Sequence, residues 1–162
     1  MPEASTMKRA ARAKRQGKSA GTQAGKFVRE EMEHIREGKH GARSAKQAIA
    51  IGLSKARRAG VKLPPSATAS AAARRKARAD SAAATKRRKP SRKRQRATLG
   101  ALQREGSAAA SHLALSRHAH SAARQRTASD RSAAARKAAR TKGRAGRQAS
   151  ARKAARTRRT AH

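Results

Sequence analysis

The chain has 162 residues, and its 44 Lys and Arg against 8 Asp and Glu give a formal net charge of +36. Forty-three of its hydrophobic residues are alanine and only fifteen are larger, a composition that excludes one large hydrophobic core. There is no cysteine, no apolar run of the ~20 residues that a membrane helix needs, and no secretory signal. We therefore expect a cytoplasmic protein without a membrane partner.

The charge and the large apolar side chains are unevenly distributed. Residues 1–64 carry a net charge of +11 and eleven of the fifteen large apolar residues, whereas residues 65–162 carry +25 and the other four. This asymmetry predicts a mostly α fold, in which a small helical hairpin head precedes a largely disordered or conditionally helical basic tail.

Residues 1–21 form a basic segment with a possible helix at Met7–Gln16, and residues 22–64 form the predicted head. The first helix of the hairpin is expected over Thr22–Glu37. Its apolar face is Ala24, Val28, Met32 and Ile35. Its acidic side chains, which are Glu30, Glu31, Glu33 and Glu37, are interpreted as an exposed face that could restrain the basic tail.

The second helix is expected to begin at Ser44 and to end at Gly60, because Ser44 and Gln47 have the spacing of a capping box. Gly52, on its apolar face, would allow the two helix backbones to approach closely. Ile51 points away from that face. It is interpreted either as a second contact surface, which would include a homodimer through the head, or as a single exposed isoleucine.

Three segments follow the head. Residues 65–97 are predicted to be a basic linker, residues 98–126 a weak amphipathic helical segment broken near Gly106, and residues 127–162 an Ala/Arg/Lys repeat tail. In the tail, RSAAARKAARTK at 131–142 and RQASARKAARTR at 147–158 match at nine of twelve positions. The densest basic run, Lys86–Arg96, is expected to be extended by its proline, and in a eukaryote it would also suggest nuclear localisation.

The basic residues predict a nucleic-acid partner, because each phosphate that Lys or Arg neutralises releases a condensed counterion. The candidate contacts are Lys86, Arg87, Arg88, Lys89, Arg92, Lys93, Arg94, Arg96, Arg136, Lys137, Arg140, Arg152, Lys153, Arg156, Arg158 and Arg159, with Lys39, Arg43, Lys46, Arg57 and Arg58 as phosphate contacts on the head.

Two more specific binding modes are weighed on the head. The loop from Gly38 to Ser44 could hold a phosphate between Lys39 and Arg43, although an ordinary capped turn is favoured. The helix–turn–helix outline would place Lys46, Ala50, Ser54 and Arg57 on a free recognition face, although a plain hairpin is favoured.

No catalytic residues, cofactor or metal site are predicted. His34 and His40 are the only histidines near carboxylates in sequence, a His118–His120 metal site is disfavoured, and no nucleophile has a partner base. The single aromatic, Phe27, argues against sequence-selective binding of single-stranded RNA.

The stretch from Gly25 to Pro64, with KQAIAIGLSKARRAG at Lys46–Gly60, resembles a bacterial family of small basic proteins that carry a domain of unknown function. Some members are labelled plasmid stabilisation proteins, which implies a role in DNA maintenance. The tail is similar in style to Ala/Lys/Arg-rich proteins that resemble linker histones.

The expected function is non-sequence-specific binding and compaction of DNA by a histone-like, nucleoid-associated protein linked to plasmid or chromosome maintenance. DNA is preferred over RNA as the partner. One alternative is a protein-interaction or antitoxin-like regulator with an accessory basic tail, and another is a protein that binds RNA or the ribosome without sequence preference.

Overall fold

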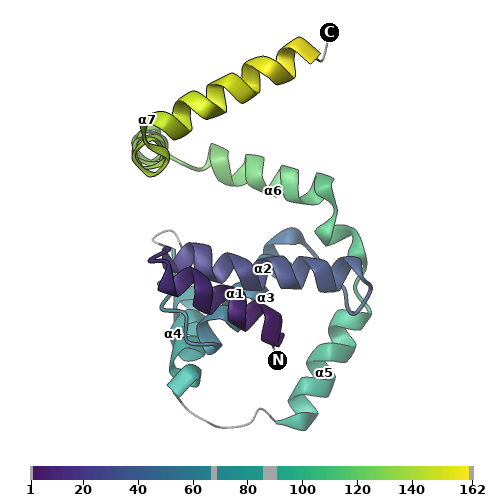
Figure 1. The fold of residues 1–162 in the computed structure, drawn as a ribbon. Coiled ribbons are helices and arrows are strands. Elements are labelled where there is room, and N and C mark those ends of the chain that lie inside the picture. The colour runs from purple at the N-terminus through teal and green to yellow at the C-terminus, as the bar shows by residue number, and fades with distance from the viewer. Residues whose placement is uncertain (1, 67–68, 86–90, 161–162) are drawn as a thin grey trace. The chain divides into compact units, whose positions relative to one another are not determined.

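The computed structural model describes residues 2–66, 69–85 and 91–160, and these ranges are predominantly helical (Figure 1). The elements are α1 (Ala4–Arg15), α2 (Ala20–Arg36), α3 (Ala45–Arg58), α4 (Ala71–Thr85), α5 (Arg92–Gln103), the short 3-10 helix η1 (Ser107–Ala110), α6 (His112–Arg124) and α7 (Ala128–Thr160). The chain divides into two compact units, Met1–His118 and Ala119–His162. No helix in the described ranges is long and apolar enough to cross a membrane.

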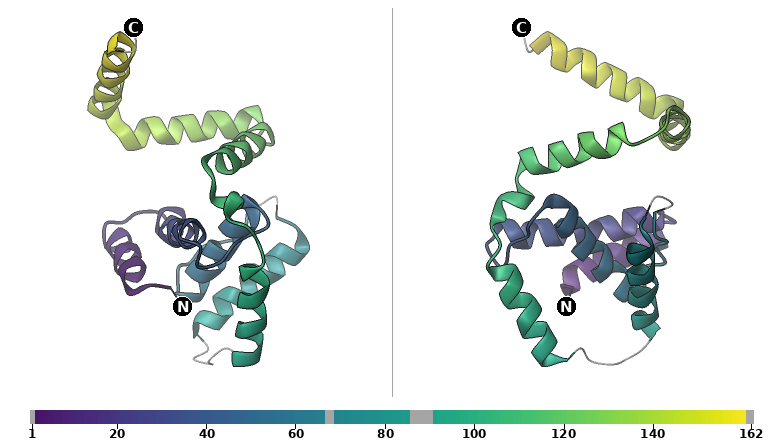
Figure 2. Two further views of the ribbon diagram at one scale, coloured as in Figure 1. Left: turned by 90° about the vertical axis from the view of Figure 1, so that its right-hand side faces the viewer. Right: turned by 180° about the vertical axis from the view of Figure 1, so that it is seen from behind.

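The first unit is built around α2, which packs against both α1 and α3 (Figure 2). Serine side chains cap the two central helices: Ser19 Oγ accepts from the amide of Thr22 at 3.3 Å, and Ser44 Oγ accepts from the amide of Gln47 at 3.2 Å. The predicted start at Ser44 is therefore confirmed. The Gln47 side chain reaches back to the amide of Arg43 at 2.9 Å, one residue before the position that an ideal capping box uses.

Small side chains make up most of the core. One cluster joins Met32 and Ile35 of α2 to Ala48 of α3 and to the alanines of η1. A second cluster gathers Ala10 of α1, Phe27 of α2 and residues at the end of α3. Because alanines replace large apolar side chains, the helices bury little area per residue and must lie close together to exclude water.

The predicted close approach at Gly52 is confirmed. A Cβ atom at this position would lie 2.6 Å from Cα of Val28 and 3.0 Å from its Cγ2. Ile51 is half-buried. It lies three residues before Ser54 and seven before Arg58, on the side of α3 that receives α4.

The interpretation of Glu30 and Glu31 as exposed is wrong, since they are 1% and 0% exposed. The sequence pattern of α2 alone suggested solvent on this side, but the chain before α1, the loop after α2 and α3 all meet the two carboxylates. Lys55 of α3 supplies the nearest cation, forming an ion pair with Glu31 Oε2 and lying 4.0 Å from Glu30 Oε1. The backbone amide of Glu3 donates to Glu30 Oε1 at 3.2 Å.

The segment expected as a linker contains two helices. Helix α4 packs on α3 through Asp80, which is 1% exposed and accepts hydrogen bonds from Ser54, Arg58 and Lys76 at 2.7, 2.9 and 2.8 Å. Burial raises the pKa of Asp80, but these hydrogen bonds outweigh it and hold the pKa below the ordinary value of 3.8. A single acidic residue in a basic segment thus docks a helix onto the head.

The prediction of a largely disordered or conditionally helical tail is wrong, because residues 128–160 form α7. None of its residues is buried. Alanine, arginine and lysine are among the strongest helix formers, and the backbone hydrogen bonds of a helix are local, so this helix needs no core. Gly143, with φ 63° and ψ −178°, kinks α7 between residues 128–142 and residues 144–160.

We predict that Gly52→Ala destabilises the α2–α3 pair by about 1–3 kcal/mol, because its methyl group would press on the backbone of Val28. Gly25→Ala on α2 is the matched control, since a Cβ there meets nothing within 4 Å. The control should be neutral or stabilising by about 1 kcal/mol. Hydrogen exchange of the α2 and α3 amides measures both, and equal protection in the two variants would contradict the close packing.

We predict that Asp80→Asn weakens the docking of α4 by about 1–3 kcal/mol, seen as faster hydrogen exchange over Ala71–Thr85. Because the pKa of Asp80 is lowered by folding, its contribution is fully present above about pH 4. The contribution is lost as the pH falls through the lower folded-state pKa, so wild-type α4 should lose protection in strong acid. Asp130→Asn, on exposed α7, is the control and should leave α4 unchanged.

Candidate nucleic-acid interface

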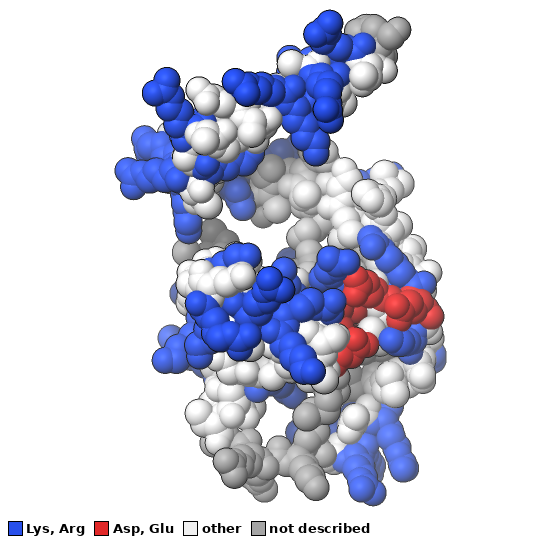
Figure 3. Space-filling model, viewed as in Figure 1, with Lys and Arg blue, Asp and Glu red and all other residues white. Residues whose placement is uncertain are grey.

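The carboxylates are all engaged within the protein. All eight acidic residues lie in the described ranges, and three of them, Glu30, Glu31 and Asp80, are buried. Of the others, Glu33 pairs with Arg29 at 2.7 Å, and Asp130 accepts from Thr127 Oγ1 at 2.8 Å at the start of α7. None of the described Lys and Arg side chains is buried, and the chain keeps an excess of positive charge, much of it visible on the face in Figure 3.

Figure 3 shows Lys and Arg spread over the visible face of α1 and α2, with the acidic side chains gathered in one patch. At the end of α2, Lys39 lies 2.8 Å from Glu37 and 3.6 Å from Glu3. The hydrogen bond from His34 holds the pKa of Glu3 below its ordinary value. Outside this patch, the charged side chains of the described residues visible in Figure 3 are Lys and Arg.

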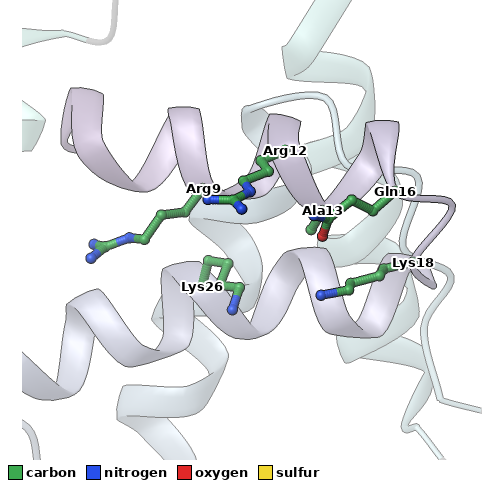
Figure 4. A pocket seen from close by; sticks show the side chains of 6 residues that line it. All are labelled: Arg9, Arg12, Ala13, Gln16, Lys18 and Lys26. Atoms are coloured by element: carbon green, nitrogen blue, oxygen red, sulfur yellow. The ribbon is translucent and has the colours of Figure 1, made fainter.

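An open groove of about 270 Å³ between α1 and α2 concentrates several cations (Figure 4). Ala10 and Ala13 of α1 are buried, whereas Arg9 and Arg12 are exposed. The lining residues are Arg9, Arg12, Ala13, Gln16, Lys18 and Lys26. We name these six residues the α1–α2 groove. Its guanidinium and ammonium groups suit a phosphate.

This groove was not predicted from the sequence. The signal that could have found it is the spacing of Arg9, Arg12 and Gln16, which places them on one side of a helix. Its other wall could not be predicted, because Lys18 and Lys26 reach the groove only through the packing of α1 on α2.

The predicted contacts of the tail lie on two matched helical segments. Arg136, Lys137 and Arg140 precede the kink at Gly143, and Arg152, Lys153 and Arg156 follow it at an offset of sixteen residues. Across the kink, Arg147 donates to the carbonyl of Ala139 at 2.8 Å. All of the predicted contacts on α7, including Arg158 and Arg159, are exposed. The kink thus gives each repeat copy its own basic helical arm.

The densest basic run is not extended where the structure describes it. Arg92, Lys93, Arg94 and Arg96 lie in the first turns of α5 and are exposed. Ser91 is the N-cap residue of α5, and arginine and lysine are good helix formers, so this part of the run is helical. Lys86, Arg87, Arg88 and Lys89 lie outside the described residues.

The phosphate contacts predicted on the head are mostly committed to other partners. Lys39 pairs with Glu37 at 2.8 Å, Arg43 lies 3.5 Å from Glu105, and Arg58 bonds Asp80. Arg57 donates to the carbonyl of Leu63 at 3.0 Å. Lys46 is exposed on α3, and no ion pair links it to another described residue.

The loop after α2 does not present its amides to an anion. The amide of Gly41 donates to the carbonyl of Leu102 at 2.9 Å, and that of Ala42 donates to the carbonyl of Gly106 at 3.2 Å. The amide of Arg43 donates to Gln47. The proposed free recognition face of α3 is also partly covered, because Ser54 bonds Asp80 of α4. Both findings favour the plain capped hairpin.

We predict that Arg12→Gln, Lys18→Gln and Lys26→Gln together lower duplex affinity near 0.1 M salt, by up to about tenfold for each phosphate that the groove no longer neutralises. The matched control removes three charges already paired with carboxylates, in Arg29→Gln, Lys39→Gln and Arg43→Gln. Its affinity should fall less. Fluorescence anisotropy with a labelled duplex measures both, and equal reductions in affinity would exclude a special role for the groove.

Residues 13–67 match the model of a family described as a family of unknown function (DUF6496). The match spans all of α2 and α3 and ends before α4, so it covers the helical hairpin but not the basic arms. Neither the curated proteins nor the solved structures contain a match to the chain. The hairpin is therefore similar to a domain of unknown function, and the resemblance of the tail to linker histones stays a prediction.

Proposed function

We propose that this protein binds duplex DNA without sequence preference and compacts it, in the manner of a histone-like, nucleoid-associated protein. The observation that carries the proposal is α7. This helix holds twelve Lys and Arg against one Asp, and none of its residues is buried. Such a surface has no folding role that would explain its charge, and phosphate neutralisation with counterion release would use all of it.

The two arms of α7 support compaction as well as binding. Each arm carries one copy of the repeat, and the kink at Gly143 gives the arms different directions. Two weak sites joined in one chain raise the overall affinity without any additional interaction, provided that both can be occupied together. Arms that engage separate phosphate backbones would bring two DNA segments together.

The lack of base-stacking groups argues for phosphate recognition and for duplex DNA over single-stranded RNA. The chain has one aromatic residue among Phe, Trp and Tyr, and this residue, Phe27, is 1% exposed in the core. Proteins that read single strands stack bases on exposed aromatic side chains. Such a protein would act in the cytoplasm on the nucleoid, and a role in plasmid or chromosome maintenance is part of this proposal.

We predict that neutralising either arm of α7 weakens binding equally. The variants are Arg136→Gln, Lys137→Gln and Arg140→Gln in one arm, and Arg152→Gln, Lys153→Gln and Arg156→Gln in the other. Glutamine keeps the helix propensity, so circular dichroism should be unchanged. Each triple variant should bind duplex about tenfold or more weakly, and the variant with all six substitutions should be weakened by at least the product of the two effects.

Duplexes of unrelated sequence should bind within about threefold of one another, since phosphate contacts carry no sequence information. An unchanged affinity in the variant with all six substitutions would contradict the proposal. Crosslinking in cells followed by sequencing of DNA and RNA identifies the partner, and we expect the DNA pool to dominate. Recovery of RNA alone would support the RNA alternative, and a protein partner that survives nuclease treatment would support the regulatory alternative.

A further inference from the structure

Three potential metal ligands meet at the end of α2. Glu31 and His34 lie three residues apart on the helix, which places them on one side, and His40 comes from the loop that follows. One ligand atom from each residue can be chosen so that all three lie within 4.8 Å of one another. The two imidazole rings meet edge to face, with centroids 6.1 Å apart.

The orientation of each ring is fixed by a second interaction. His40 Nδ1 lies 3.1 Å from the carbonyl oxygen of Gly41, which can only accept, so Nδ1 carries a proton. His40 Nε2 then faces Glu31 Oε1 at 3.3 Å. His34 Nε2 lies 2.8 Å from Glu3 Oε1. A backbone carbonyl on the ring nitrogen remote from the ion, as at His40, is the arrangement that orients metal-binding histidines, and the bond to Glu3 leaves Nδ1 of His34 to serve as its ligand.

Glu31 needs more positive charge than its surroundings supply. It is 0% exposed, and neither of its carboxylate oxygens accepts a well-aligned hydrogen bond from a described residue. Its neighbour Glu30 is also buried, and Lys55 is the cation that both carboxylates share. An ionised carboxylate buried without hydrogen bonds is costly, so a cation beside Oε1 would relieve a real deficit.

We propose that Glu31, His34 and His40 bind a divalent transition-metal ion, with zinc as the best match. Two imidazole nitrogens and one carboxylate oxygen are a ligand set that zinc accepts, whereas magnesium and calcium prefer oxygen ligands alone. Zinc bonds of about 2.0–2.2 Å in a tetrahedron place ligand atoms roughly 3.3–3.6 Å apart. The separation of 3.3 Å between His40 Nε2 and Glu31 Oε1 already fits, and a ligand atom of His34 lies within 4.8 Å of the other two residues.

The bound ion would stabilise the fold of the head. It would join α2 to the loop before α3 and, through the hydrogen bond between Glu3 and His34, would steady the start of α1. The ligand set shares no residue with the basic arms or with the α1–α2 groove, so it can be tested separately from nucleic-acid binding.

The test uses the full chain, freed of nucleic acid and stripped of metal with a chelator. Titration with Zn²⁺ in a calorimeter should show one ion bound per chain at this site. The double variant His34→Gln, His40→Gln should bind the ion more than about tenfold more weakly. The double variant His112→Gln, His120→Gln, at exposed positions of α6, is the matched control and should bind as the wild type does.

A measurement on the wild-type chain keeps the test valid if the ligand variant fails to fold. Nitrogen NMR of the histidine side chains should show Zn²⁺-induced shifts confined to two of the six rings, those of His34 and His40. The proposal is wrong if Zn²⁺ shifts neither ring, if the shifts fall on the histidines of α6, or if a folded ligand variant binds as tightly as the wild type.

Discussion

In this strongly cationic chain, a few carboxylates hold the helices of the head together, and the rest of the structure depends on them. Asp80 docks α4 onto α3, and the Glu30–Glu31 pair with Lys55 joins α2 to α3 beneath α1. Glu105 lies 3.5 Å from Arg43. Beside this pair, the amides of Gly41 and Ala42 bond to backbone carbonyls at the end of α5 and just after it. The acidic residues therefore hold elements together, and none of the described Lys and Arg residues that they do not reach is buried.

A chain with fifteen large apolar side chains can still form a packed head because its helices approach very closely. Gly52 removes the side chain that would separate α2 from α3, and Ala48 and Ala56 are fully buried beside it on α3. Gly41 likewise lets the loop after α2 approach the backbone of Glu105, since a Cβ there would lie 1.8 Å from the carbonyl oxygen of Glu105. Close approach of the backbones supplies dispersion energy that larger side chains supply elsewhere.

Features encoded locally were predictable from the sequence, and those that depend on a third helix were not. The cap at Ser44 and the close approach at Gly52 follow from short patterns and are confirmed. The burial of Glu30 and Glu31 depends on Lys55 of α3, His40 of the loop and the chain before α1, which no pattern within α2 indicates. The docking of α4 likewise depends on Asp80 meeting Ser54, twenty-six residues away in the chain.

For the tail, the prediction of disorder from composition was wrong. A low apolar content with a high charge indicates that a chain cannot bury a core, and α7 indeed buries nothing. A helix rich in alanine and arginine needs only its own hydrogen bonds, so the lack of a core did not imply the lack of structure. The proposed metal ligands were not predicted from the sequence: Glu31 and His34 have helical spacing, but only the fold brings His40 to them.

The ion pairs that stabilise the head and the exposed cations that we propose bind DNA are different groups. A salt series tests most directly whether the two act independently. Duplex affinity and hydrogen exchange of α2 and α3 would be measured on the same samples between about 50 and 200 mM salt. If six or more phosphates are bound, affinity should fall by about 10³-fold or more while amide protection in the head stays constant. Affinity that hardly changes with salt, or a head whose protection falls in parallel with it, would contradict this independence.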